Sequence, residues 1–325
     1  NVVIGVTGTK GKSTTVSLIY SVLKQAGKSV HLIGNIGKPM LDEMLKPIGK
    51  EDIFVCEFSS YQLDDIEYSP HISVILDLFP EHMNYHGDVK NYYNAKKNII
   101  TRVAADDYFI YNPKFAELKS WAKNSHCKNI PFEQNIPIRD EDIPLIGKHN
   151  RENIKASITV AHLLDIDDVT IIKAIKEFRP LPHRLQLIGK FKEITFYDDA
   201  ISTTPQSTIL AIESLKNIGT IFLGGTDRGY DFNKMVEVII DYKIPNIVLF
   251  PESGDVILKI IKSKKAEYLR IFNTKSMEEA VKFAYKYTPQ NKICLLSNAS
   301  PSYSLWKNFE EKGDLFQSLV KKYNR

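Results

Sequence analysis

The first residues of this 325-residue chain carry its clearest chemical pattern. Residues 5–14 read Gly-Val-Thr-Gly-Thr-Lys-Gly-Lys-Ser-Thr and lie between an apolar run and an amphipathic stretch. A glycine-rich turn between a strand and a helix lets backbone N–H groups surround a phosphate. We therefore expect Lys12 to reach the β- and γ-phosphates of a nucleotide and the Ser13 hydroxyl to ligate Mg²⁺. The residues of this expected nucleotide loop are Gly8, Thr9, Lys10, Gly11, Lys12, Ser13 and Thr14.

The loop has one weakness as a nucleotide signature. A strict Walker sequence has glycine where Val6 stands, so the segment is a shorter variant. The alternative is a glycine-rich strand–helix turn in which the Lys-Ser pair occurs by chance.

Other polar residues stand close to the ends of apolar runs. Glu57 directly follows the run 53–56, and it either caps the next helix or, with the phosphate loop nearby, ligates a metal ion. His82 and His86 are four residues apart, as in a zinc pair on a helix. Pro80 precedes the pair, Gly87 follows it, and Met83 stands at the second position, where a zinc-binding His-Glu-x-x-His helix has glutamate, which argues against zinc.

Strand-length apolar runs alternate with helix-length segments along the whole chain, which is typical of parallel sheets covered by helices. Strands are expected at 2–6, 53–56, 72–76, 220–223, 247–250, 269–271 and 293–296. Helices are expected at 13–25, 89–100, 154–164, 206–215, 233–240, 256–261, 277–285 and 305–320, and Asp167 or Asp168 could cap a further helix that runs to Phe178. Pro180 and Pro182 interrupt the alternation. The sequence thus predicts an α/β protein with a P-loop-type domain at 1–180 and a Rossmann-like α/β domain at 181–325.

Composition indicates a globular protein of the reducing cytoplasm. Hydrophobic residues make up 43% and charged residues 25%, and the net charge is only +4. Lysines are dispersed, so nothing calls for a nucleic-acid or membrane partner, and no apolar run approaches the ~20 residues of a membrane span. The three cysteines have no metal-type spacing, and we expect reduced thiols.

Motifs along both domains resemble the Mur ligases, whose phosphate loop reads Gly-Thr-x-Gly-Lys-Ser/Thr. The other matching segments are 34–37 (Gly-Asn-Ile-Gly), 57–63 (Glu-Phe-Ser-Ser-Tyr-Gln-Leu), 81–83 (Glu-His-Met), 95–96, 149–153, 181–184 and 297–309. Segment 57–63 and Lys307-Asn308-Phe309 are most similar to the glutamate-adding branch, MurD. The segment 85–88 (Tyr-His-Gly-Asp) is more like MurE, but the Asp-Asn-Pro-Arg motif of that branch is missing from the sequence.

The resemblance implies an ATP-dependent amide ligase with two Mg²⁺ sites. Ser13 and Glu57 would ligate the first ion, and His82 and Lys96 the second. Lys96 would do so as a carbamate, because an ammonium beside a dication is electrostatically unfavourable and Mg²⁺ prefers oxygen ligands. Without the resemblance, Lys96 is a solvated helix lysine like its neighbour. The catalytic residues implied are Lys12, His82 and Lys96.

The resemblance also implies residues that hold the nucleotide outside the loop. These are Asn35, Asn150, Asn153, His183, Arg184 and Asp199. Asn150 and Asn153 are three residues apart, so they share one helix face and either reach the adenine edge or cap the helix.

The expected substrates are UDP-N-acetylmuramoyl-L-alanine and glutamate, with the D form favoured and the L form open. The residues implied for the amino-acid pocket are Thr203, Arg228, Ser302, Tyr303 and Phe309. Ile201 stands where MurD enzymes carry a lysine, and Arg228 replaces a glutamate-binding lysine. Arginine can still pair with a carboxylate, and more rigidly than lysine.

Two further readings stay open. In the first, the chain is another Mur-type ligase, similar to MurE, MurC or folylpolyglutamate synthase, that uses a different amino acid. In the second, it is a nucleotide-binding module without catalysis. The chain begins on a strand at Asn1 without an initiator methionine, so we expect the N-terminal UDP-binding domain of the family to be lacking. We also expect a monomer that works in peptidoglycan precursor synthesis.

Overall fold

The computed structural model describes residues 1–36, 40–133, 135–264 and 266–324, so Gly37 of the predicted glycine turn lies outside the described residues. The chain divides into two compact units, Asn1–Arg179 and Pro180–Arg325. The division falls within one residue of the expected boundary between 180 and 181. Each unit is built on a sheet of six strands covered by helices, which confirms the predicted α/β class.

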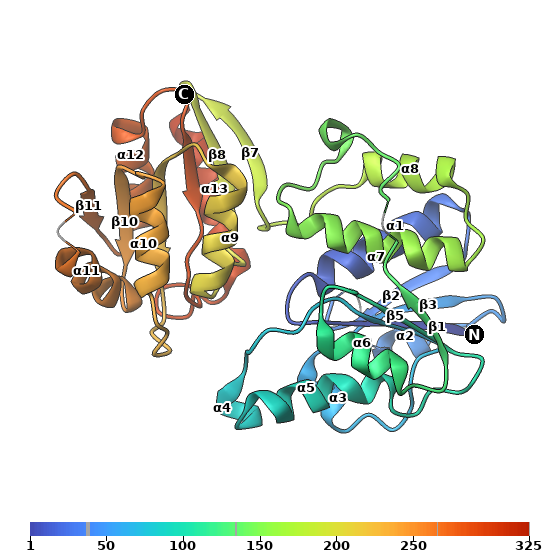
Figure 1. The fold of residues 1–325 in the computed structure, drawn as a ribbon. Helices are drawn as coiled ribbons and strands as arrows, with labels where there is room; N and C mark the ends of the chain where they lie inside the picture. The colour runs from blue at the N-terminus through green and yellow to red at the C-terminus, as the bar shows by residue number, and fades with distance from the viewer. Residues whose placement is uncertain (37–39, 134, 265, 325) are drawn as a thin grey trace. The chain divides into compact units, whose positions relative to one another are not determined.

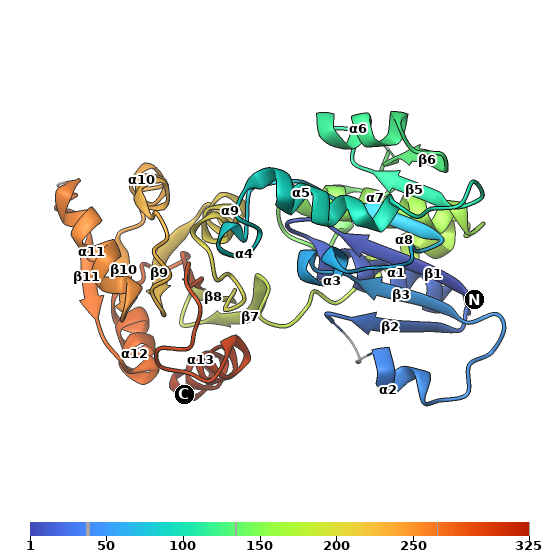
Figure 2. The same ribbon diagram turned by 90° about the horizontal axis from the view of Figure 1, so that it is seen from below.

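The sheet of the first unit is parallel throughout, in the order β2-β3-β1-β4-β5-β6 (Figure 2). Its strands are β1 (Val2–Thr7), β2 (Val30–Gly34), β3 (Ile53–Glu57), β4 (Ile72–Ile75), β5 (Tyr108–Tyr111) and β6 (Lys128–Pro131). The central strand β1 lies between β3 and β4. In a parallel sheet the carboxyl ends of neighbouring strands share one edge, so the residues after β1, β3 and β4 meet there.

Helices cover both faces of this sheet (Figure 1). One face packs against α1 (Lys12–Gln25), α7 (His149–Leu163) and α8 (Asp168–Glu177), and the other against α3 (Ser60–Asp64), α5 (Val89–Lys97) and α6 (Ala116–Lys123). The short helices α2 (Met40–Met44) and α4 (Met83–His86) and 3₁₀ turns at Asn98–Ile100 and Asp140–Asp142 complete the unit. Side chains start several of these helices: Asp88 caps α5, Asp167 caps α8, and Ser59 with Gln62 forms a capping box on α3.

The second unit has a mixed sheet in the order β11-β10-β9-β12-β8-β7. Its strands are β7 (Gln186–Phe191), β8 (Ile194–Asp198), β9 (Ile218–Gly224), β10 (Asn246–Phe250), β11 (Arg270–Asn273) and β12 (Ile293–Leu296). All neighbours are parallel except the edge hairpin β7–β8. Helices α9 (Pro205–Leu215), α10 (Asn233–Asp241) and α11 (Ser253–Ser263) cover one face, and α12 (Met277–Tyr287) and α13 (Phe309–Tyr323) the other.

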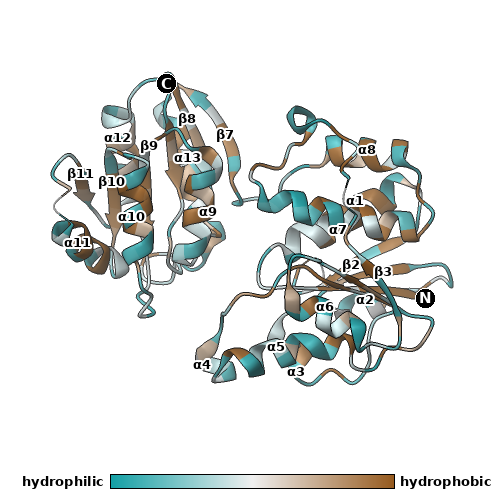
Figure 3. Ribbon diagram, in the orientation of Figure 1, coloured by the Kyte–Doolittle hydropathy of each residue, from teal (hydrophilic) through white to brown (hydrophobic). Residues whose placement is uncertain are grey.

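Hydrophobic residues fill the layers between sheet and helices in both units. Figure 3 shows the central strands as hydrophobic and the outer sides of the helices as largely hydrophilic. Among the described residues, none of the helices has both the length and the apolar character required to cross a membrane. All three cysteines, Cys56, Cys127 and Cys294, are buried and free, as expected.

The structure corrects several predicted boundaries. The helix expected at 305–320 begins at Phe309, because the Asn308 side chain accepts a hydrogen bond from Glu311 N and so caps the helix there. The helix expected at 89–100 ends at Lys97 and continues as a 3₁₀ turn. The helix expected from residue 154 already begins at His149, so Asn150 and Asn153 lie within it.

Candidate active site

Two glycines give the loop between β1 and α1 its shape. Gly8 has φ 157° and Gly11 has φ 83°, conformations that side chains with a Cβ rarely adopt. A Cβ on Gly11 would also lie 2.2 Å from Asn153 Oδ1, because helix α7 passes directly against the loop. The loop therefore needs glycine at both positions for its turn and for its packing.

The backbone of the loop is held from two sides. Its N–H groups at Thr9 and Lys10 donate to Asp77 Oδ1 at 2.5 and 2.9 Å. Its carbonyl oxygens at Gly8 and Thr9 each accept from Lys12 Nζ at 3.0 Å. Lys12 thus folds back over the loop that precedes its own helix, where a phosphate bound by the loop would lie within its reach.

Lys96 enters the same site from helix α5. Its side chain is 1% exposed, and its Nζ donates to Gly8 O at 2.8 Å. The reading of Lys96 as a solvated lysine is therefore wrong, whereas Lys97 is indeed exposed. Burial lowers the pKa of Lys96 to about 7, and the positive charge of Lys12 acts in the same direction. Burial likewise lowers the pKa of Lys12, against the opposing carboxylates of Glu57 and Asp77.

Glu57 brings an uncompensated carboxylate oxygen to this edge of the sheet. The side chain is 2% exposed at the end of β3, and its Oε1 accepts from Asn35 Nδ2 at 3.1 Å. Its Oε2 is buried without a hydrogen-bond partner. The capping alternative for Glu57 is wrong, because Ser59 caps helix α3. A buried carboxylate oxygen with no donor fits a cation, and Mg²⁺ commonly combines one or two carboxylates with substrate phosphates.

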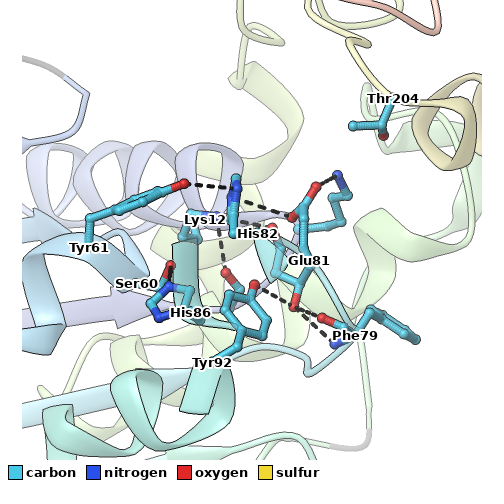
Figure 4. A network of polar contacts seen from close by, with 12 residues as sticks. Lys12, Ser60, Tyr61, Phe79, Glu81, His82, His86, Tyr92 and Thr204 are labelled. Atoms are coloured by element: carbon cyan, nitrogen blue, oxygen red, sulfur yellow. Dashed lines mark hydrogen bonds and ion pairs between the residues drawn. The ribbon is translucent and has the colours of Figure 1, made fainter. Parts of the chain in front are cut away.

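His82 lies at the rim of the site, immediately before α4. Its backbone is left-handed, with φ 59°, and its Nδ1 is 3.2 Å from the Tyr61 hydroxyl. Glu81 beside it forms an ion pair with Lys10, 2.8 Å from Oε1 to Nζ (Figure 4). Burial lowers the pKa of His82, so the ring favours its neutral, ligating form near neutral pH.

His86 does not join His82 in a metal pair. Its ring bonds Ser60 Oγ at 3.0 Å, inside the unit (Figure 4). Within the described parts of the chain no group of three or more His, Cys, Asp or Glu side chains could hold a metal ion. Any Mg²⁺ here would therefore depend on phosphate oxygens of the substrate as further ligands.

Hydroxyl groups tie the loop to the segment that carries His82. Thr9 Oγ1 donates to Phe79 O at 3.1 Å and accepts from Phe79 N at 3.0 Å. Tyr92, buried on α5, donates its hydroxyl to the same Thr9 Oγ1 at 3.1 Å (Figure 4). The loop, the 79–82 segment and helix α5 thus form one connected hydrogen-bonded network.

Asn150 and Asn153 sit beside the loop on α7. Asn153 Nδ2 donates to Asn150 Oδ1 at 2.8 Å, and Asn150 Nδ2 donates to Ile146 O at 2.7 Å. The capping alternative for these two residues is wrong, because Lys148 occupies the N-cap position and no side chain caps the helix. Their contact with an adenine stays a prediction.

In the second unit, the predicted nucleotide contacts His183 and Asp199 are engaged in internal hydrogen bonds. His183 Nδ1 lies 2.7 Å from Asp198 Oδ2, and this bond raises the pKa of His183. Asp199 accepts from Leu185 N at 3.1 Å and from Ser297 Oγ at 2.8 Å. Burial raises the pKa of Asp199 to about 7. Arg184 is partly exposed next to them.

The predicted amino-acid pocket draws on three adjacent strands of the second unit. Thr203 follows β8, Arg228 follows β9 and Ser302 follows β12, and these strands are parallel neighbours, so the three loops share one edge of the sheet. Arg228 is exposed, and the buried Ser302 Oγ has no hydrogen-bond partner.

The remaining two pocket residues lie differently. Tyr303 is 64% exposed. Phe309 is the first residue of α13 and lies edge-on to the His183 ring, with centroids 6.0 Å apart. Neither has a polar side-chain contact to another pocket residue.

Sequence reasoning missed three residues of the first site: Asp77, Glu81 as the partner of Lys10, and Tyr92. Asp77 follows an apolar run directly, as Glu57 does, and this position was the available signal. Tyr92 has no local signal, because only the docking of α5 brings its hydroxyl to Thr9.

Comparison with known proteins decides the family. A model of the Mur ligase middle domain matches residues 6–141. A UDP-N-acetylmuramoylalanine--D-glutamate ligase of Caldanaerobacter subterraneus is 33% identical over 98% of this chain and 75% of its own length. One of the same name from Streptococcus pyogenes is 35% identical over 97% and 73%. The chain belongs to the Mur ligase family. It is therefore an ATP-dependent ligase.

Solved structures share the Mur ligase fold of this chain at low sequence identity. The MurF ligase of Thermotoga maritima, solved with ADP, superimposes with a TM-score of 0.76 at 17% identity and covers 99% of this chain and 81% of that one. FolC of E. coli, also with ADP, reaches 0.71 at 13% identity, covering 100% and 90%. At these identities the likeness concerns the fold alone.

Proposed function

We propose that this ligase joins D-glutamate to UDP-N-acetylmuramoyl-L-alanine in peptidoglycan precursor synthesis, with ATP as the energy source. The observation that carries the substrate assignment is that relatives of this name match the chain across both units at 33–35% identity. Lys12 and Ser13 of the phosphate loop, together with Glu57, are the residue types that such a reaction needs at the phosphates.

The carboxylate of the acceptor nucleotide attacks the γ-phosphorus of ATP, and ADP leaves. The amine of glutamate then attacks the acyl phosphate carbon, loses a proton and displaces inorganic phosphate. Phosphoryl transfer depends mostly on positioning and on neutralising charge. Lys12 supplies a fixed positive charge over the loop, and Glu57 with Ser13 would hold one Mg²⁺ at the phosphates. That ion, when bound, would neutralise further negative charge on the phosphates.

We propose that Lys96 acts as a carbamate beside His82. A neutral amine attacks CO₂, the N–C bond forms and a proton is released, which turns a cationic group into an anionic one. A buried amine whose pKa is about 7 is largely neutral above that pH, and so is available for the reaction. The resulting carboxylate oxygens suit a second Mg²⁺. The observation that favours this is that Lys96 is buried and that its Nζ donates to the Gly8 carbonyl oxygen and the Thr7 hydroxyl, neither of which carries a negative charge.

We propose that the amino acid binds at the shared edge of β8, β9 and β12. The Arg228 guanidinium is exposed and can pair in a bidentate manner with one carboxylate of glutamate. Ser302 Oγ, buried and without a partner, can bond the second. A diamino acid would instead place an ammonium against Arg228, a like-charge contact that disfavours it.

Isotope transfer tests this mechanism. UDP-N-acetylmuramoyl-L-alanine labelled with ¹⁸O in its carboxylate is incubated with ATP, Mg²⁺ and D-glutamate, and the products are analysed by mass spectrometry. We expect the glutamate-extended nucleotide together with inorganic phosphate that carries one ¹⁸O. Product formation with unlabelled phosphate would contradict the acyl phosphate route, and no product at all would contradict the assignment.

A further inference from the structure

We infer that Asp77 is a positioning residue that braces the phosphate loop for ATP, an inference that rests on the proposed function. Asp77 follows β4, the strand that pairs in parallel with β1, whose own end opens the loop. The carboxylate therefore reaches the loop from the adjacent strand end. The bracing is a side-chain contact across the sheet edge and does not belong to the loop itself.

The contacts of Asp77 are directed at the loop backbone. Oδ1 accepts from both Thr9 N at 2.5 Å and Lys10 N at 2.9 Å. Gly8 leaves room for this approach, since a Cβ there would lie 3.2 Å from Oδ1 and 2.9 Å from Leu76 Cβ. Hydrogen bonds to an ionised acceptor are about twice as strong as neutral ones, so one carboxylate oxygen fixes two consecutive peptide units.

The bracing leaves the phosphate-binding groups of the loop available. Asp77 takes the N–H groups of Thr9 and Lys10, which precede helix α1. The first N–H groups of a helix have no acceptor within the helix, so those at the start of α1 stay directed toward a bound anion. The N–H groups of Thr9 and Lys10 bond Asp77, and the Gly8 and Thr9 carbonyl oxygens bond Lys12, so these contacts restrict the loop to one backbone conformation.

Nucleotide binding by variants tests the inference without the other substrates. Asp77→Ala removes both side-chain acceptor contacts and keeps the 3.3 Å bond from Thr9 N to the Asp77 backbone oxygen. We expect ADP–Mg²⁺ to bind ~10-fold more weakly or worse by calorimetry. The KM for ATP should rise by a similar factor while kcat changes less. Asp77→Asn keeps an Oδ1 that can accept the same two bonds, so it should bind within about threefold of the wild type. Amide hydrogen exchange at Lys10, whose N–H bonds the Asp77 side chain, should accelerate in the alanine variant only.

Asp167→Ala is the matched control. Asp167 Oδ1 and Oδ2 also accept two hydrogen bonds, from Thr170 N and Thr170 Oγ1 at 2.9 Å each, but at the start of α8. This variant should lose stability and keep its ADP affinity. Equal or tighter ADP binding by Asp77→Ala, or an asparagine variant as weak as the alanine one, would overturn the inference. Failure of the wild type to bind ADP would instead overturn the proposed function.

Discussion

Lys12 and Lys96 both direct their ammonium nitrogens at carbonyl oxygens of the phosphate loop, yet they come from different helices. Two amines so close together are unfavourable as two cations, and the charge of Lys12 adds to burial in lowering the pKa of Lys96. The arrangement becomes favourable once phosphate groups supply negative charge. Such a cluster of positive groups is expected of a site that binds a polyanionic nucleotide.

Lys12→Ala should abolish ligation and leave the fold intact. The lysine contacts loop carbonyls and no hydrophobic core, so its loss removes stabilisation of the transferring phosphoryl group, typically ~10²–10³ in rate. Steady-state ADP release measures the change, with thermal unfolding as the check on folding. Lys24→Ala, an exposed lysine of the same helix, is the control and should behave as wild type. Near-normal turnover by a folded Lys12→Ala protein would overturn the assigned role of the loop.

Lys96 should carry a carbamate whose formation follows pH. With a pKa of about 7, the amine is mostly protonated at pH 6 and mostly neutral at pH 8, so the carbamate should appear as pH rises through 7. Carbon-13 NMR with labelled bicarbonate should show its signal in the wild type and in Lys97→Ala, but not in Lys96→Ala. The alanine variant should be inactive and partly rescued by short carboxylic acids. A wild-type spectrum at pH 8 with Mg²⁺ but without that signal would rule the carbamate out.

Helices α1 and α7 meet at Gly11, where the phosphate loop ends. Gly11→Ala should destabilise the first unit and weaken nucleotide binding together, because the new Cβ would lie 2.2 Å from Asn153 Oδ1 in a left-handed backbone. Gly27→Ala is the control: Gly27 also has positive φ, 73°, but a Cβ there would meet nothing within 4 Å. The free energy of unfolding of Gly27→Ala should fall only by the ~1–2 kcal/mol that a side chain costs in a left-handed backbone conformation. Thermal unfolding and ADP calorimetry measure both effects, and equal losses in the two variants would contradict the packing argument.

Helix α13 buries a third lysine, at the end of β9. Lys312 is fully buried, donates to Gly224 O at 3.1 Å and lies over the Trp306 ring. Burial lowers its pKa well below the usual value. The unfolded chain then binds the proton more readily than the native state, so the stability of the wild type should rise with pH between the native pKa and about 10.5.

Replacing this lysine should remove that part of the pH dependence. The stability of Lys312→Met relative to the wild type should therefore be highest at pH 6.5 and fall steadily toward pH 9.5. Melting temperatures of both proteins across this range measure it. Lys321→Met, an exposed lysine of the same helix, should show no such trend. A pH-independent difference for Lys312→Met would contradict the lowered pKa.

The phosphate loop and most central strands could be predicted from sequence, because their patterns are local. The hairpin β7–β8 could not. Lys192 and Glu193 form its turn with positive φ at both positions, where Asn-Gly is the usual signal. Asp77 was missed because its role depends on β4 pairing with β1, and a single sequence does not reveal strand order. Lys312 was missed because a lysine on an amphipathic helix is ordinarily exposed.

For the whole molecule, the evidence for the fold differs from the evidence for the substrate. The fold is shared with MurF and FolC at 13–20% identity, so it does not distinguish one amino acid from another. The D-glutamate assignment rests on relatives above 30% identity and on Arg228 at the edge of the second sheet. The loops after β8 and β9 depart from the MurD pattern at Ile201 and Arg228, and both positions lie where the amino acid would be oriented.

The most direct test of the account is the amino acid that drives ATP turnover. ADP release by the full-length native protein is measured with UDP-N-acetylmuramoyl-L-alanine, ATP and Mg²⁺, and with D-glutamate, L-glutamate, L-lysine or diaminopimelate added singly. We predict turnover with D-glutamate, weaker turnover with L-glutamate and background rates with the two diamino acids, because in the proposed pocket Arg228 would pair with a carboxylate and repel an ammonium. Turnover with lysine or diaminopimelate but not with glutamate would contradict the account, and L-glutamate exceeding D-glutamate would contradict its stereochemical part.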